Sequence, residues 1–489
     1  TPCVSRAPSA AITFRQPGRG SMVQAVFELV SPPTSSYVQR HWRVILLTLS
    51  AAAIASAGSA QLLHGTSPLT VLRSSRLCYA LGCNAPRRLL FRGSLISLPG
   101  RAEPAVLRGF NIVLKHGEAG LDHVTRQDWL LFKLLPHTSL VRLVVNHWAD
   151  DVTAPGTDCY DDAAEDFLRP ECLALLEEAV SWVTEAGAFA VITARSALAA
   201  GDAGANASVF ENVTLRMHWV RMWGAVARRF ASTDNIAGYE VMSEPRTFAP
   251  FEVVHAAQRE ACAAVWAHDP RAACVIGAAR YYNRFRLNAS LLIRGGGPVL
   301  YAANFFEPKV WVSSNNAGVT NPSASASRAG WYGEGGHDCC EAYQKDESSK
   351  VAICGARTQA DCAAAPTIRI DRAWLEFQLR NILAFRAAHD VPVWIDQFGV
   401  HAAALGGTAL VERYLDEVLG LFEAAGLHWT YWLWRRPFAV EQNAIVVEPT
   451  RHIGGGWDCG GFALVCQPTE GAPYQLNEPL LSALGSLIR

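Results

Sequence analysis

Acidic side chains at the ends of apolar segments are the first candidates for chemistry in this sequence. The segment Gly238–Pro245 carries Glu240 and Glu244, and a proline follows Glu244 directly. Because side chains alternate along a strand, Glu240 and Glu244 share one face, with Glu240 the deeper of the two. A carboxylate that ends a strand in this way points into the mouth of a pocket, where it can give or take a proton.

A second apolar segment, Val393–Gly399, contains the pair Asp396 and Gln397. Further polar and aromatic residues stand near the ends of other apolar segments. Arg142, His147, Trp148, Ser243 and Trp434 stand there and are candidates for contacts with a ligand. The strand ends do not cluster His and Asp as a metal site would, so we expect neither a metal nor a cofactor.

The elements that must position these residues alternate between short apolar strands and longer amphipathic helices, which predicts a parallel sheet with crossover helices. The expected strands are Gly109–Ile112, Leu140–Asn146, Phe189–Thr193, Ala237–Ser243, Cys274–Ile276, Val299–Asn304, Val393–Gln397 and His428–Leu433. The expected helices are Pro170–Ala186, Leu215–Phe230, Phe251–His268, Asp371–His389 and Leu410–Ala425. Eight such units in order predict a (β/α)8 barrel, with a doubly wound open sheet as the alternative.

Barrel chemistry lies at the carboxyl ends of the strands, which is where the candidate residues fall. A long cysteine-containing loop, residues 313–365, separates the sixth and seventh strands and would cover that face. We divide the chain into residues 1–60, upstream sequence plus a secretory signal or signal anchor; residues 61–104, an N-terminal leader; and residues 105–489, the barrel with a C-terminal wrap.

In their order along the chain, these motifs resemble glycoside hydrolase family 5, the cellulase-like retaining glycosidases of clan A. The resemblance rests on Arg-Gly-Phe-Asn in the first strand, Val-Arg-Leu in the second, Glu-Pro after the fourth, Phe-Gly after the seventh and Trp after the eighth. It spans about residues 107–436. It implies a two-carboxylate mechanism, in which one Glu protonates the leaving oxygen and the other attacks the anomeric carbon.

The sequence departs from the family at several of its functional positions. Glu244 matches the acid/base, but Ser243 replaces the Asn that precedes it in the family. Gln397 stands where the family has its nucleophilic Glu, and a neutral amide is a poor nucleophile. The family's third-strand His falls at Arg195, whereas Arg142 and Trp434 are retained. Its sixth-strand His-x-Tyr pair appears as Asn304-Phe305-Phe306, so the resemblance adds Asn304 and Phe306 to the candidate substrate-binding residues.

Two interpretations keep the chain an enzyme. Asp396 could replace Gln397, although strict alternation would point it at the helix layer. Alternatively, Gln397 could hold a water molecule while another acid, Glu307 or Glu240, acts as the base, with inversion at the anomeric carbon. Glu307 is otherwise expected to be a loop carboxylate facing water, and Trp434 is expected either to floor a sugar site or to be core.

Composition limits the classes of partner. The formal net charge is −1, so nothing favours nucleic acid. Basic Arg40 and Arg43 precede a short apolar run that ends in small residues, a pattern typical of a secretory signal. Thirteen cysteines suit an exported, disulfide-bonded chain, and three glycosylation sequons are compatible with export. We therefore expect a secreted or extracellular protein, with a membrane involved only through a signal anchor.

Two functions remain open at this point. The first is a glycoside hydrolase acting on O-glycosidic bonds of a β-linked polysaccharide or glycoconjugate, with Glu244 as the acid/base. The second is a catalytically inactive barrel that binds glycans as a lectin-like or matrix protein. Gln397 favours the second, whereas the retained Glu244 favours the first, because an unused buried acid is costly.

Overall fold

The chain divides into two units, Thr1–Asn84 and Ala85–Arg489, and every described residue belongs to the second. The computed structural model describes residues 88–101, 103–114, 126–145, 161, 163–165, 167–195, 209–245, 249–307, 371–399, 408–432, 434, 465–466, 475–476 and 478–487. The loop expected over the barrel, residues 313–365, lies outside them. None of the helices in the described part is long and apolar enough to cross a membrane.

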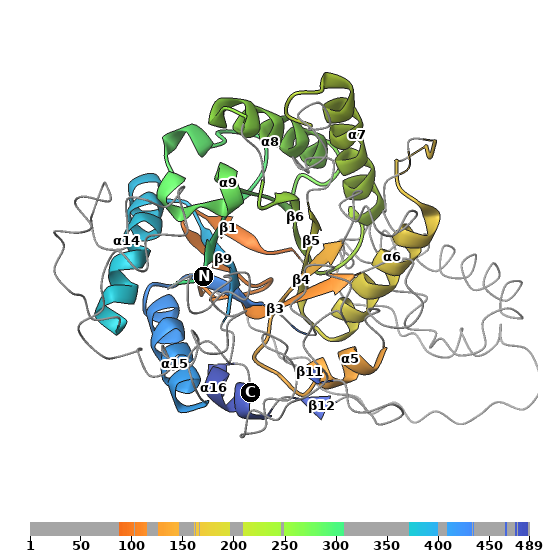
Figure 1. Ribbon diagram of the computed structural model, residues 1–489. Helices are drawn as coiled ribbons and strands as arrows, with labels where there is room; N and C mark the ends of the chain where they lie inside the picture. Colours follow the sequence, from red (N-terminus) through yellow and green to blue (C-terminus); the bar gives the residue numbers. More distant parts are fainter. Residues whose placement is uncertain are drawn as a thin grey trace, which may run out of the picture. The chain divides into compact units, whose positions relative to one another are not determined.

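A closed barrel of parallel strands forms the centre of this unit, as Figure 1 shows. Its strands are β3 (Arg108–Leu114), β4 (Leu140–Val145), β5 (Phe189–Arg195), β6 (Ile236–Ser243), β7 (Ala273–Gly277), β8 (Val299–Phe305), β9 (Val393–Phe398) and β10 (His428–Tyr431). Each strand pairs in parallel with the next along the chain, and β10 closes the ring by pairing with β3. The prediction of a (β/α)8 barrel is therefore confirmed.

Helices surround the barrel because each strand presents one apolar face outwards. They are α5 (Arg126–Phe132), α6 (Pro170–Glu185), α7 (Val213–Phe230), α8 (Phe251–Trp266), α9 (Ala279–Tyr282), α14 (Arg372–His389), α15 (Thr408–Ala424) and α16 (Glu478–Leu484). The side chains of Asn212 and Asp371 cap the starts of α7 and α14. Each accepts hydrogen bonds from backbone N–H groups of the first turn, which have no partner within the helix. A disulfide between Cys262 and Cys274 joins α8 to β7.

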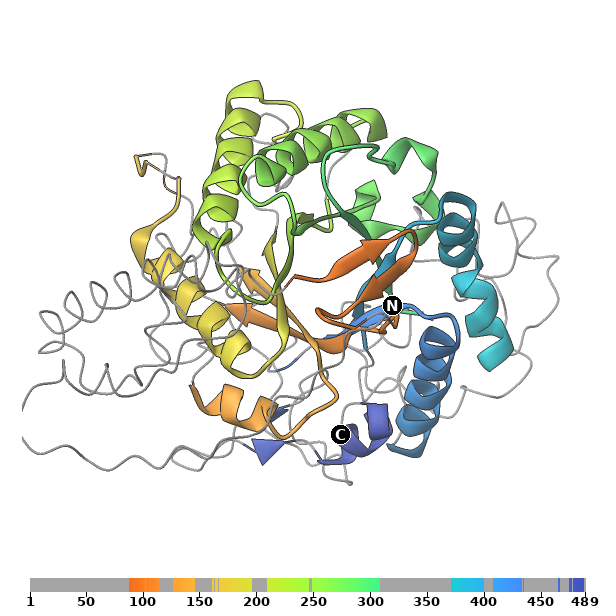
Figure 2. The ribbon, with the colours of Figure 1, turned by 180° about the vertical axis from the view of Figure 1, so that it is seen from behind.

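A short hairpin closes the amino-terminal end of the barrel. Strands β1 (Leu90–Arg92) and β2 (Leu95–Ser97) pair antiparallel, and Figure 2 shows this hairpin lying across the barrel. Leu89 and Ile96 pack into the same buried cluster as the inward-facing Phe189 and Trp394. Asp390, in a left-handed conformation at the end of α14, accepts a hydrogen bond from the N–H of Ser94 and so fixes the turn. The opposite end of the barrel is left to carry the site.

Two small elements complete the described fold. Strands β11 (Val465–Cys466) and β12 (Gln475–Leu476) pair antiparallel. Short 3-10 helices span Arg284–Arg286, Ala289–Leu291 and Gly485–Leu487.

Candidate active site

Glu244 stands at the carboxyl end of β6, where the chain turns sharply. Its backbone is left-handed (φ 49°), a conformation that a residue with a Cβ adopts only at a cost. Its side chain is half-buried and accepts a hydrogen bond from Nδ2 of Asn304, which lies near the end of β8. Backbone strain of this kind persists where the surrounding structure holds it, and it concentrates at functional sites.

The strained segment has a counterpart after β7. Tyr281 and Tyr282 are also left-handed, with φ of 62° and 51°. The N–H of Tyr281 donates to the carbonyl of Pro245 (3.4 Å), and Asn304 donates to the carbonyl of Tyr281 (3.4 Å). Asn304 therefore ties the two strained turns together. Tyr281 itself is 51% exposed.

Below Glu244, a fully buried cluster of charges fills the barrel. The guanidinium of Arg142 donates two hydrogen bonds to the carboxylate of Glu240, at 2.6 and 2.7 Å. It also donates to Ser243 Oγ (2.6 Å) and to Asn111 Oδ1 (2.9 Å). Burial opposes the charge of Arg142, but the nearby carboxylates of Glu240 and Asp396 outweigh it and raise its pKa. Glu240 is thus bound to Arg142 and is not placed as a free base.

Asp396 belongs to this cluster, and the expectation that it points at the helix layer was wrong. Its Oδ2 lies 3.4 Å from Nη2 of Arg142, and the residue has no exposed surface. Ile395 and Phe398 both pack outwards, so two residues separate them where strict alternation allows one. The pairing of β9 with both neighbours shifts register at this point, which is the mark of a β-bulge.

The bulge has identifiable causes. The backbone carbonyl of Asp396 accepts hydrogen bonds from the side chains of Asn111 (3.0 Å) and Thr430 (2.6 Å), which lie on β3 and β10. These two donors satisfy the backbone carbonyl of the extra residue away from the regular ladder, so the bulge does not leave that carbonyl unpaired. Asp396 and Gln397 both turn towards the barrel as a result.

Gln397 follows Asp396 on β9 and is linked to Glu244 through Asn304. It is 5% exposed and stands opposite Asn304 in the pairing of β8 with β9. Asn304 therefore contacts Glu244 on one side and pairs with Gln397 on the other. The Nε2 of Gln397 donates to Oδ2 of Asp396 at 3.3 Å.

The expected role of Trp434 as the floor of a sugar site is not supported. The residue is completely buried, and its ring packs between β3 and α5. Its ring centroid lies 5.3 Å from that of Phe110 and 5.6 Å from that of Phe132. Its indole N–H donates to Asp128 (3.1 Å). Trp434 is core on the helix side of the barrel. Trp432, half-buried two residues earlier, is the aromatic residue nearer the strand end.

Glu307 is not a loop carboxylate facing water. It is 7% exposed and forms a buried ion pair with Arg284, which also donates to Gln378 (3.0 Å). Because this pairing occupies its carboxylate, Glu307 is a structural residue rather than a base. Phe306 next to it is partly buried against the outer core.

Several expected positions lie outside what the structure describes. They are His147, Trp148 and the side chain of Arg195. Tyr282, by contrast, was missed: its ring fills the barrel interior, and its hydroxyl donates to the carbonyl of Met242. The sequence signal for it was an aromatic pair, Tyr281 and Tyr282, a few residues after a predicted strand.

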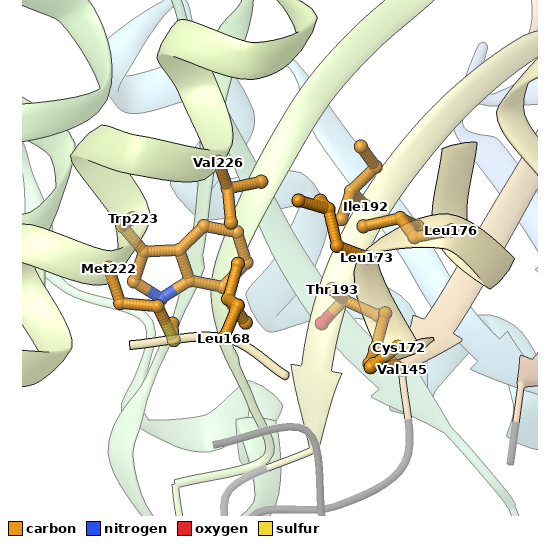
Figure 3. Close-up of a pocket in the computed structure, with 10 residues that line it drawn as sticks. All are labelled: Val145, Leu168, Cys172, Leu173, Leu176, Ile192, Thr193, Met222, Trp223 and Val226. Carbon is orange, nitrogen blue, oxygen red and sulfur yellow. The ribbon is translucent and has the colours of Figure 1, made fainter. Parts of the chain in front are cut away.

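An apolar pocket lies apart from this site, between α6, α7 and the strands they cover (Figure 3). It is lined by Val145, Leu168, Cys172, Leu173, Leu176, Ile192, Thr193, Met222, Trp223 and Val226. Sugars need hydrogen-bonding partners, and this lining offers almost none. Within the described residues, no group of His, Cys, Asp and Glu is arranged to hold a metal ion.

Comparison with known proteins bears directly on this geometry. The cellulase model of glycosyl hydrolase family 5 matches residues 136–436, which contain β4 to β10 and with them Glu240, Glu244 and Asp396. The chain belongs to glycoside hydrolase family 5. No curated protein matches it in sequence. Its family assignment is thus secured by the match to the family model.

Solved structures share the fold of this family 5 chain at low sequence identity. Subunit Z of the clostridial cellulose synthase from Clostridioides difficile has a TM-score of 0.52 at 15% identity, covering 78% of this chain and 100% of its own. Cel5A from Thermotoga maritima, in a mutant form with cellobiose, scores 0.51 at 14% identity and covers 78% and 97%. At such identities the likeness shows the barrel and not the chemistry.

Proposed function

We propose that this family 5 chain is a glycosidase that cleaves O-glycosidic bonds of a β-linked polysaccharide or glycoconjugate. Glu244 is its acid/base, and Gln397 occupies the position of the family's nucleophile. The observation that carries the proposal is the arrangement around Asn304, which holds Glu244 by a hydrogen bond and stands opposite Gln397. A glycosidic oxygen placed above Asn304 would have a carboxyl group on one side and the amide on the other.

A β-linked glucan is the first substrate to test. The family model that matches is that of cellulases. One of the similar structures holds cellobiose, a β-linked disaccharide. Exposed Tyr281, which Asn304 links to Glu244, supports a sugar as the ligand, since the apolar face of a pyranose packs on an aromatic ring.

The alternative function is glycan binding without catalysis, as a lectin-like or matrix protein. One observation favours it: the residue opposite Asn304 is an amide, and the neighbouring carboxylate of Asp396 has no exposed surface. A buried carboxylate cannot attack an anomeric carbon directly. The two functions predict the same ligand and differ in turnover.

We further propose that the protein is exported, after a secretory signal or signal anchor within residues 1–60. The disulfide between Cys262 and Cys274 supports this location, because disulfides persist in oxidising compartments. Cys172 is disulfide-bonded as well.

The experiment that tests the proposed function is hydrolysis by the full chain on β-glucans, β-mannans and glycolipids, with Glu244→Gln beside it. Loss of a general acid typically lowers the rate by about 10²- to 10⁴-fold. Turnover by the wild type that falls by this factor in Glu244→Gln is the expected result. Binding to the same glycans without any turnover would instead support the lectin-like alternative.

A further inference from the structure

Resting on this function, the geometry points to a proton relay in which Gln397 and buried Asp396 together act as the general base for an attacking water. The ionised form of Asp396 can only accept hydrogen bonds, so in this form the Gln397 amide turns its Nε2 towards Oδ2 of Asp396, as it does here at 3.3 Å. The Oε1 of Gln397 is then left facing away from Asp396, free to accept a hydrogen bond from water.

Burial decides why the relay needs both residues. Asp396 has no exposed surface, so neither substrate nor a bulk water molecule reaches its carboxylate directly. Gln397 lies at the strand end and is 5% exposed. A water on the site side can therefore contact the amide, while the charge that drives proton removal lies one residue deeper.

The state of the Asp396 carboxylate is suited to accepting a proton. Among the described residues, its Oδ1 has no hydrogen-bond partner, although it is fully buried. Glu240, in contrast, has both oxygens bound by Arg142. A buried oxygen without a partner is destabilised as an anion, and protonation relieves that cost.

The electrostatic surroundings agree with this view. Burial raises the pKa of the Asp396 carboxyl well above its usual range; the guanidinium of Arg142 opposes the shift, while Glu240 and Glu244 add to it. Tyr282, on the inner side of the barrel, is a further titratable group that interacts with Asp396. A carboxylate with a raised pKa is a stronger base than an ordinary Asp.

The step balances as a single displacement. The water oxygen forms a bond to the anomeric carbon as the glycosidic C–O bond breaks, and Glu244 gives its proton to the leaving oxygen. The water proton passes to Oε1 of Gln397, and an Nε2 proton of Gln397 passes to Oδ2 of Asp396. Glu244 is left ionised and Asp396 protonated. The proton on Asp396 then returns to the amide nitrogen of Gln397. Gln397 Oε1 loses its proton to solvent and Glu244 regains one from solvent, so all three groups are restored. Because one displacement occurs, the anomeric configuration inverts.

Stereochemistry of the wild type tests the relay without any variant. Proton NMR of the freshly released sugar from a β-linked substrate should show the α-anomer first. A wild type that releases the β-anomer first would overturn the relay and leave the proposed function standing. A wild type that hydrolyses nothing on the panel would overturn both.

Asp396→Asn, made both in the wild type and in a Gln397→Glu variant, distinguishes a proton-accepting Asp396 from a merely structural one. Asp396→Asn should lower kcat by about 10²-fold or more and abolish the acidic limb of the pH profile, which the Asp396 pKa sets. In a Gln397→Glu background the attacking or basic charge is already present at position 397. There, Asp396→Asn should cost less than about threefold.

An equal loss in both backgrounds, or an unchanged acidic limb, would assign Asp396 to structure alone and overturn the relay. Thermal unfolding of each variant is the control for folding. Asp396→Asn keeps the two hydrogen bonds between Arg142 and Glu240, so the central ion pair of the barrel is preserved.

Discussion

At the scale of single residues, Arg142 balances the buried charges of Glu240 and Asp396 in the centre of the barrel. Replacing it by Met would leave both acids in a medium that cannot solvate an anion. We expect Arg142→Met to lower the free energy of unfolding by about 3–5 kcal/mol, as for other broken buried pairs. Denaturant unfolding at neutral pH measures this.

Lys133→Met is the matched control, because Lys133 pairs with Glu185 at 2.8 Å on the surface. An exposed pair of this kind is worth less than about 1 kcal/mol. Equal losses in the two variants would contradict the central role of Arg142.

Replacing Trp434 should change stability and not substrate binding, whereas replacing Tyr281 should change substrate binding. Trp434→Phe removes the donor to buried Asp128, so the free energy of unfolding should fall by about 1–3 kcal/mol with KM unchanged. Tyr281→Ala removes an exposed ring and keeps a Cβ in the strained backbone, so KM should rise by about tenfold, or ~1.4 kcal/mol. Steady-state kinetics beside thermal unfolding separates the two. A changed KM in Trp434→Phe would contradict the assignment of Trp434 to the core and place it in the substrate site.

Some residues of the site were predictable from the sequence and others were misplaced, for physical reasons. Glu244 and Arg142 were predictable, because an acid at a strand end and a lone charge inside an apolar run are both costly unless they serve a site. Asp396 was misplaced because alternation assumes a regular strand, and the bulge depends on donors from two distant strands. Trp434 was uncertain because an aromatic residue near a strand end suits core and cleft equally.

At the scale of elements, strand existence was easy to predict and fine structure was not. All eight barrel strands lie where the apolar runs predict them, since strands buried on both faces have little other pattern. The hairpin of β1 and β2 was missed because three-residue strands carry no periodicity. The same holds for α9, whose four residues are too few for a helical pattern.

The disulfide between α8 and β7 gives a prediction at this scale. Cys262 and Cys274 are separated by 12 residues in sequence. Replacing both by Ala opens a short loop in the unfolded chain, and the loop-entropy relation gives a loss of about 3 kcal/mol. Urea unfolding of the double variant measures the loss. A change below about 1 kcal/mol would mean that packing of α8 alone holds this junction.

At the scale of the whole molecule, the ring of strands closes where β10 pairs with β3. There the Nδ1 of buried His428 accepts a hydrogen bond from the N–H of Leu107 (3.1 Å), and the N–H of Trp429 donates to the Leu107 carbonyl (2.9 Å). Burial, aided by the charges of Arg386 and Arg108, lowers the pKa of His428 to about 3. Protonation would replace the acceptor of this bond by a donor.

The closed barrel should therefore lose stability in acid through His428. Its folded pKa lies below the ordinary value of 6.5, so the contribution is complete above pH 6.5 and is lost as pH falls towards 3. The expected slope is about 1.4 kcal/mol for each pH unit in that window. Unfolding free energies at pH 7.5 and 4.5 measure it. His428→Asn keeps an acceptor but cannot titrate, so the difference between the two pH values should shrink in that variant.

The three left-handed residues around Asn304 carry a consequence for anyone who engineers this protein. Glycine would adopt this backbone with less strain, but the ring of Tyr282 fills the barrel interior, so only Glu244 and Tyr281 could become glycine without a large loss of packing. Selection for heat resistance alone would consequently favour mutations that remove Glu244 and Tyr281 from the proposed site. A library screened for thermal survival should accumulate glycine at these two positions while its turnover declines, so the two traits need to be selected together.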